Sequence, residues 1–320
     1  MLGLETLVSL GKQASATNPT TLARQSLNVY KITGGQSEPA TDDNILGGGL
    51  NNLEDPVAPA PGLDDHRITV EVPLCMAQFP FWLAAFFGTP ADAGTDPDYT
   101  HDYVSGAALP YCTLEHQLTT GKYRRHFGLV GEELTIDLGS DKAGFGSATM
   151  TFVGLSEVAA GAALTGSVTA APALDRPAQK LLNVIYNSVS GGDIMSGKID
   201  FKRNLLRVRA ADGSGIPYAV ERNGISTLTG SIHIRYHGDT FYTDGVNQTV
   251  RDLSIELMRT EARGIQVAMA NMRLDRTPVD ISGPDGVEMD INFRAWQTTD
   301  DPALALTVLN STATVGSFSS

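Results

Sequence analysis

The sequence predicts a mainly β protein built from two similar halves. Apolar and polar residues alternate at period two along most of the chain, which is typical of half-buried strands. One pair of alternating segments recurs 119 residues further on. The chain has 320 residues, which corresponds to about two domains at roughly 150 residues each. Only the segments 79–88 and 180–186 have a helical pattern.

Residues 1–25 are polar and irregular and are expected to form an N-terminal arm. Leu27, Val29 and Ile32 then begin the first predicted strand. Residues 33–65 show no periodicity and predict a long loop. A loop of this length inside a domain is usually functional or ordered by a partner.

A strand and a short helix follow the long loop. Apolar residues alternate over 68–72, and Pro73 ends this strand. The segment QFPFWLAAFFG predicts a short helix that ends at Gly88, and residues 89–102 are expected to form a loop.

Strands become dense after this loop. Their apolar residues are Leu114; Leu134, Ile136 and Leu138; Ala148, Met150 and Phe152; Ile199 and Phe201; Ile232 and Ile234; Leu253, Ile255 and Leu257; Val267 and Met269; and Val287, Met289, Ile291 and Phe293. The stretch 156–180 is rich in small residues and marks the expected domain junction. The predicted domains are 26–172, which includes the loop 33–65, and 173–320.

The repeat supports duplication of one domain. The segment ELTIDLGSDKAGFGSATMTFVGL (133–155) aligns without gaps on DLSIELMRTEARGIQVAMANMRL (252–274). Leu134 then falls on Leu253, and Met150 falls on Met269. With one residue of slip, Tyr123 falls on Phe241. Each half is therefore expected to contain a hairpin, a long connection and a second hairpin.

The sequence contains no set of residues that predicts catalysis, a cofactor or a metal ion. His233 and His237 have a metal-like spacing, but on a strand this spacing separates them by about 13 Å, too far for one zinc ion. The segment GDIMSGKI (192–199) resembles a phosphate loop but continues as a strand instead of a helix. Cys75 and Cys112 are expected to be buried free thiols. We therefore do not expect an enzyme.

The charge balance argues against a protein that binds nucleic acid tightly through its phosphates. Lys and Arg number 23 against 36 Asp and Glu, a net charge of −13, whereas phosphate binding needs clustered cations. This balance remains compatible with a protein past which nucleic acid slides. The longest apolar run is far shorter than the roughly 20 residues of a membrane helix, so no membrane association is expected.

Four stretches, taken in order, carry a resemblance to a known family. They are NILGGG (44–49) leading to RITVEVPL (67–74); FPFWLAAFFGTP (79–90) followed by YTHDYVSGAALPYCTLEHQL (99–118); KYRRHFGLVGEELTIDLGSDKAGFGSATMTFVGL (122–155); and VDISGPDGVEMDINFRAW (279–296). Together they resemble the tail tube proteins of long-tailed bacteriophages.

The resemblance implies two tandem β-sandwich or barrel domains of the tail-tube type, each with a long hairpin or loop and at least one with a flanking short helix. Copies of the chain would join into rings, and the rings would stack into a hollow tube for phage DNA. The tape measure, terminator and baseplate proteins would be further partners. The protein would be made in the bacterial cytoplasm and end in the virion. Because each chain would supply two domains, a ring of six domains would need three chains.

The resemblance also indicates candidate contact residues. Contacts between rings or subunits are expected from a basic hairpin arm and from the start of the long loop: Lys122, Tyr123, Arg124 and Arg125, with Asn44, Ile45 and Leu46. Acids that alternate with apolar neighbours are the candidates for the tube lumen: Asp137, Asp200, Glu256 and Asp290. Two other functions remain open, namely a single-ring terminator or baseplate protein and a monomeric β-barrel that binds a small ligand.

Overall fold

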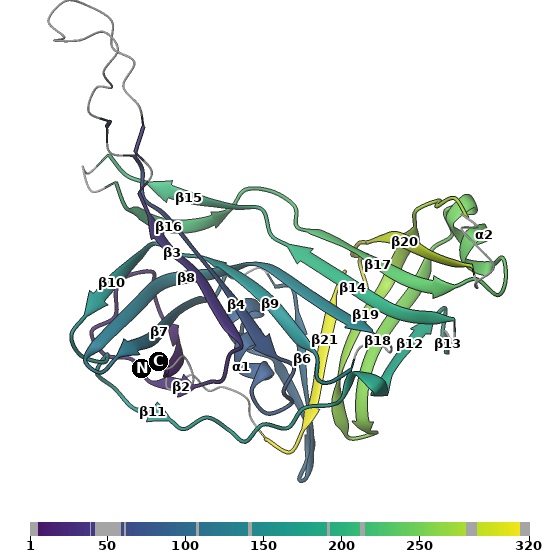
Figure 1. Cartoon of the computed structure of the whole chain (residues 1–320), viewed down its shortest axis with the longest axis horizontal. Coiled ribbons are helices and arrows are strands. Elements are labelled where there is room, and N and C mark those ends of the chain that lie inside the picture. Colours follow the sequence, from purple (N-terminus) through teal and green to yellow (C-terminus); the bar gives the residue numbers. More distant parts are fainter. Residues whose placement is uncertain are drawn as a thin grey trace, which may run out of the picture.

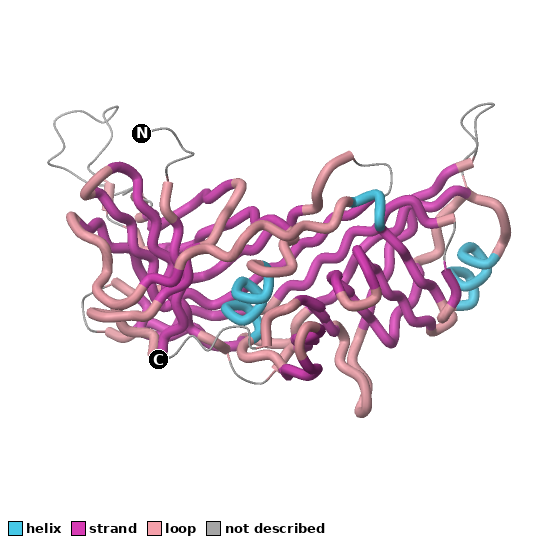
Figure 2. The backbone as a smooth tube through the Cα atoms, turned by 90° about the horizontal axis from the view of Figure 1, so that it is seen from below, coloured by secondary structure: helices cyan, strands magenta, loops and turns pink. Residues whose placement is uncertain are grey.

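The computed structural model describes residues 6–38, 40–41, 59–60, 62–106, 109–139, 143–190, 193–211, 215–279 and 287–313. Within these ranges the chain is mainly β, which confirms the predicted fold class (Figure 1). Figure 2 shows the two α-helices well apart, one beside the strands in the middle of the body and one at its end.

The elements of the first half are β1 (Val8–Gln13), β2 (Arg24–Ser26), β3 (Lys31–Ser37), β4 (Asp65–Pro73), α1 (Phe79–Phe87), β5 (Ala91–Thr95), β6 (Asp98–Val104), β7 (Tyr111–Thr119), β8 (Lys122–Gly139), β9 (Ser147–Val153), β10 (Ser156–Ala160) and β11 (Val168–Thr169). The second half begins with a 3-10 helix, η2 (Gln179–Leu181). Its other elements are β12 (Leu182–Tyr186), β13 (Val189–Ser190), β14 (Ile194–Lys202), β15 (Leu205–Arg209), β16 (Pro217–Arg222), β17 (Thr227–Arg235), α2 (Thr240–Asn247), β18 (Arg251–Thr260), β19 (Arg263–Leu274), β20 (Glu288–Ala295) and β21 (Ala305–Asn310).

Strand β8 connects the sheets of the molecule. Its first part pairs with β7 and β10, and its second part pairs with β9 and β14. Gly128 lies between these parts with a φ of 62°, a conformation that glycine adopts without strain. A side chain at this position would also collide with Leu155. The glycine therefore allows one strand to serve two sheets.

One sheet extends through both halves of the chain. Its order is β3–β4–β9–β8–β14–β17–β20, and every neighbouring pair is antiparallel. A layer of β12, β18, β19 and β21, extended by β6 of the first half, packs against its second-half strands, as Figure 1 shows. The two layers touch closely, because a Cβ on Gly197 of β14 would lie 2.7 Å from Ile255 of β18.

The alternating residues predicted as core are buried. Ile68, Leu134 and Ile232 are at most 2% exposed and belong to one hydrophobic cluster that includes residues of both halves. Their polar neighbours in sequence point to the opposite face of each strand, as the period of two requires.

Helix α1 is apolar on all sides and is buried against the sheets, which confirms the predicted helix. Its Phe86 ring packs on Gly131 of β8, where an added Cβ would approach the ring to 2.3 Å. The helix has no basic residue in its last turn, but Arg203, just after β14, donates hydrogen bonds to the carbonyls of Phe86 (2.7 Å) and Gly131 (2.9 Å). The second half thus caps the helix of the first.

Several elements differ from the sequence-based expectations. Residues 89–102, expected as loop, form β5 and most of β6, because β6 pairs with the distant strand β21. The segment 180–186, expected as helix, has one 3-10 turn and then β12, which pairs with β18. Helix α2 was not expected, since its sequence TFYTDGVN has few strong helix formers.

The N-terminal segment and the long loop also contain strands. Residues 8–13 of the expected arm 1–25 pair with β7, and 24–26 form β2. Residues 33–37 of the expected loop 33–65 belong to β3, whose Gly34 and Gly35 pair with β4 although they break the alternation. Residues 42–58 lie outside the described residues.

We expect Gly131→Ala to destabilise the protein by about 2 kcal/mol, because the new methyl group overlaps the Phe86 ring in a packed core. Urea unfolding of the two proteins measures this difference. Gly161→Ala is the matched control, since nothing lies within 4 Å of the Cβ it would add. Equal unfolding midpoints for the two variants would contradict this packing.

Candidate assembly surfaces and a buried histidine cluster

The basic hairpin arm lies at the β7–β8 turn. Lys122 is exposed there, and Tyr123 and Arg124 are half-buried. Arg124 reaches Glu157 of β10, with 3.4 Å between Nε and the carboxylate. Arg125 points inward and is 11% exposed in its side chain, so only the other three residues present a surface.

Glu115 of β7 holds the inward arginine. It accepts hydrogen bonds from Arg125 at 3.1 and 3.2 Å, from Arg24 of β2 and from the backbone N–H of Leu164 at 2.9 Å. Its side chain is 3% exposed. Two guanidinium groups and one amide thus converge on a buried carboxylate that joins β2, β7 and β8.

A groove lies beside the hairpin turn. It has a volume of about 430 Å³ and is lined by the end of β7, the start of β8 and the end of β10. Leu118 contributes an apolar side chain that is 46% exposed. The candidate contact residues Lys122, Tyr123 and Arg124 line the same groove. Asn44, Ile45 and Leu46 lie outside the described residues.

The structure brings together three of the four candidate lumen acids. Asp137, Asp200 and Asp290 lie on β8, β14 and β20 of the long sheet, each between buried neighbours and so on its polar face. Glu256 lies on β18 of the other layer, where Gln266 donates a hydrogen bond to it at 2.9 Å.

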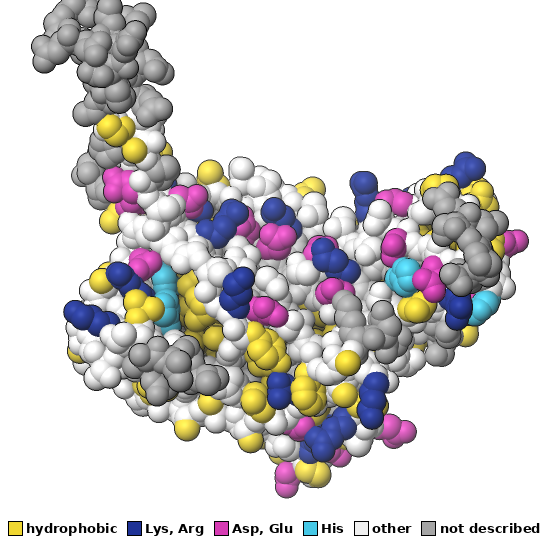
Figure 3. Space-filling model, in the orientation of Figure 1, with side chains coloured by type: hydrophobic (Ala, Val, Ile, Leu, Met, Phe, Trp, Pro, Cys, Tyr) yellow, Lys and Arg dark blue, Asp and Glu magenta, His cyan; other side chains and the backbone are white. Residues whose placement is uncertain are grey.

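Bases accompany these acids. Lys198 lies 2.8 Å from Asp200, and His233 lies 2.9 Å from Asp290. Figure 3 shows basic and acidic side chains interspersed over this side of the molecule. The polar face therefore carries paired charges of both signs.

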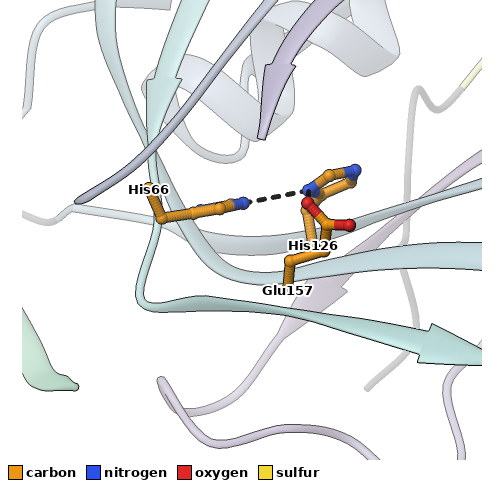
Figure 4. A group of neighbouring side chains, drawn as sticks. All are labelled: His66, His126 and Glu157. Atoms are coloured by element: carbon orange, nitrogen blue, oxygen red, sulfur yellow. Dashed lines mark hydrogen bonds and ion pairs between the residues drawn. The ribbon is translucent and has the colours of Figure 1, made fainter. Parts of the chain in front are cut away.

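A cluster of buried imidazoles lies where β4, β8 and β10 meet, and Figure 4 shows His66 of β4 and His126 of β8 pointing toward each other. Their Nε2 and Nδ1 atoms are 2.9 Å apart, and Glu157 lies 3.7 Å from His126 Nδ1. The His116 ring stacks on His126 with centroids 5.2 Å apart.

Burial keeps these histidines neutral. It lowers the pKa of His66 to about 4 and that of His126 to about 3, where the neighbouring His66 adds to the effect. It also lowers the pKa of His116. At neutral pH each ring therefore carries one proton and one free nitrogen lone pair.

Among the described residues, His66, His126 and Glu157 are the one group whose ligand atoms lie within 4.8 Å of one another, as a shared metal ion requires. Sequence reasoning missed them because they come from three strands and form no local motif. Alternation predicted the neighbouring strand 68–72, but no pattern in the sequence singled out His66, His126 or Glu157.

Comparison with known families shows which family the chain belongs to. Residues 3–295 match the family described as phage tail tube protein, which covers most of the chain. The chain belongs to the phage tail tube protein family. A comparison with curated proteins finds no match.

Membership identifies this tail tube protein as a structural component of the virion, with the β-rich architecture described above. It also indicates assembly with copies of itself and with other tail proteins. Neither α1 nor α2, the α-helices of the described ranges, is long and apolar enough to cross a membrane.

We expect Glu115→Ala to destabilise the protein by roughly 3–5 kcal/mol, because it leaves two buried guanidinium groups without a counter-charge. Urea unfolding, monitored by circular dichroism, measures the change. Glu221→Ala, at an exposed position of β16, should stay within about 0.5 kcal/mol of the unchanged protein. A decrease of less than 1 kcal/mol in the free energy of unfolding of Glu115→Ala would show that this ion-pair cluster does not stabilise the packing of β2, β7 and β8.

Proposed function

We propose that this protein is the major tail tube protein of a long-tailed phage, forming stacked rings around a channel for DNA. The long sheet β3–β4–β9–β8–β14–β17–β20 carries this proposal, because it presents one polar face and because β3, among the described strands, pairs only with β4. An unpaired edge strand is a ready template for another chain. Joining sheets edge to edge around a ring would cover such edges and turn the polar faces inward.

Duplication of one domain is part of the proposal, with 1–25 as the N-terminal segment and domains at 26–172 and 173–320. The pairing register supports it. Leu134 pairs with Met150, and 119 residues later Leu253 pairs with Met269.

The two next register pairs repeat in the same way. Thr135–Thr149 corresponds to Ser254–Ala268, and Ile136–Ala148 corresponds to Ile255–Val267. The correspondence ends before the hairpin arm, since Tyr123 lies on β8 but Phe241 lies in α2. Because a six-domain ring then needs three chains, we propose a trimeric ring with pseudo-six-fold symmetry.

The polar face suits a channel wall. DNA phosphates are held by clustered cations, and on this face Lys198 and Lys202 are engaged by Asp200 and Glu133. The acids Asp137 and Asp290 add negative charge nearby, and the whole chain carries −13. Such a wall would let DNA pass without holding it.

The other proposed partners are the tape measure, terminator and baseplate proteins, which meet a tube along its length and at its ends. Synthesis would take place in the bacterial cytoplasm. The proposed role is structural and needs neither catalytic residues nor a cofactor.

Electron microscopy of the purified full chain tests this function. We expect hollow tubes that lengthen with protein concentration. Isolated rings that never stack would instead identify a terminator or baseplate protein. A monomer at high concentration, measured by size-exclusion chromatography, would favour a ligand-binding module.

Leu118→Asp should abolish tube formation while leaving the melting temperature of the subunit within a few degrees. We propose that the groove at the β7–β8 turn receives a neighbouring copy, and a carboxylate in place of the apolar Leu118 side chain would lose its hydration at that contact. Leu118→Met keeps the apolar contact and should assemble normally. Tubes of normal length from Leu118→Asp would exclude this groove from the assembly contacts.

A further inference from the structure

We propose that His66, His126 and Glu157 form a binding site for a divalent transition-metal ion, with Zn²⁺ the best-suited ion. Two imidazole nitrogens and one carboxylate are a donor set that zinc binds in proteins. This inference does not depend on the proposed tube function, since it concerns a single subunit.

The strands bring the three donors together by their pairing. His126 and Glu157 are direct partners in the β8–β10 ladder. His66 is the second residue of β4, and its backbone carbonyl accepts a hydrogen bond from the N–H of Gly154 at 3.0 Å. A Cβ on Gly154 would lie 2.1 Å from His66 Nδ1, so the glycine leaves the space that the imidazole occupies.

The distances between the donors fit one ion after a small adjustment. In a tetrahedral zinc site with bonds of about 2.0–2.1 Å, ligand atoms lie about 3.3 Å apart. His66 Nε2 and His126 Nδ1 are 2.9 Å apart, and His126 Nδ1 and Glu157 Oε2 are 3.7 Å apart. All three donor atoms lie within 4.8 Å of one another, so side-chain rotations that move them by up to about 1.5 Å would bring each pair to the zinc spacing.

Two neutral rings facing each other at 2.9 Å share a single proton, because one nitrogen must donate to the lone pair of the other. A cation between them would engage both lone pairs. The shared proton would then move to the outer nitrogen of the same ring. His66 Nδ1 and His126 Nε2 have no hydrogen-bond partner among the described residues, so neither outer position loses a bond by carrying it.

The Glu157 carboxylate is oriented toward His126 Nδ1. Arg124 Nε engages its Oε1 at 3.4 Å, whereas Oε2 faces His126 and accepts the backbone N–H of Gln36 at 3.2 Å. Such outer contacts hold metal-binding carboxylates in place. His116 stacks on His126 but does not belong to the group of donor atoms that lie within 4.8 Å of one another, so the described residues offer three ligands.

The test uses untagged full-length protein freed of metal with a chelator. Zn²⁺ is titrated against a chromophoric competitor, and Co²⁺ is added as a spectroscopic substitute. We expect one Zn²⁺ per chain, a raised melting temperature and a Co²⁺ absorption spectrum typical of four-coordinate nitrogen and oxygen ligation. Absence of stoichiometric binding would overturn the proposal.

Two variants and one control assign the ligands. Glu157→Gln and His66→Asn should each weaken Zn²⁺ binding at least tenfold, whereas His233→Gln, at an unrelated histidine near Asp290, should leave it unchanged. Equal affinity in all three proteins would place the ion elsewhere and refute the site. If a variant does not fold, X-ray absorption of the Zn²⁺-loaded unchanged protein decides instead. Two imidazoles and a carboxylate support the site, and any sphere lacking imidazole refutes it.

Discussion

The ladder between β8 and β14 is the constraint on which the rest of this structure depends. It runs from Gly139–Ser196 to Glu133–Lys202 and makes strands from the two halves neighbours in one sheet. The same β8 pairs with β7 and β10 at its other end, beyond Gly128. The continuous polar face of the subunit depends on the β8–β14 ladder, because this ladder joins strands of the two halves in one sheet.

A buried arginine reinforces this joint. Arg203 is 1% exposed, and among the described residues no carboxylate pairs with it. Burial lowers its pKa to about 10, with Arg222 adding to the effect. The Phe86 carbonyl at the end of α1, the Gly131 carbonyl of β8 and the Phe86 ring, 4.6 Å from the guanidinium, stabilise the charge instead. Arg203 of the second half therefore holds helix α1 of the first half, and this contact would fix the two halves relative to each other.

Period-two alternation was enough to predict the buried strands. Residues such as Ile136 and Ile255 have polar neighbours in the sequence, and this local pattern indicates which face of the strand is buried. The alternation did not predict pairing between strands that are distant in the sequence. Strand β6 depends on β21, some 200 residues away, and β12 depends on β18 rather than on its own helical pattern. The hairpin arm was placed correctly on β8, but the inward turn of Arg125 follows from its partner Glu115. The histidine cluster, assembled from three strands, had no local signature.

The central claim is that one duplicated chain supplies two of the six domains around a tube. A cryo-electron microscopy map of the assembled tube, at a resolution that traces the chain, tests it most directly. The account predicts three chains per ring, with six similar lobes and the polar faces of the long sheets lining the channel. Six chains per ring would contradict it.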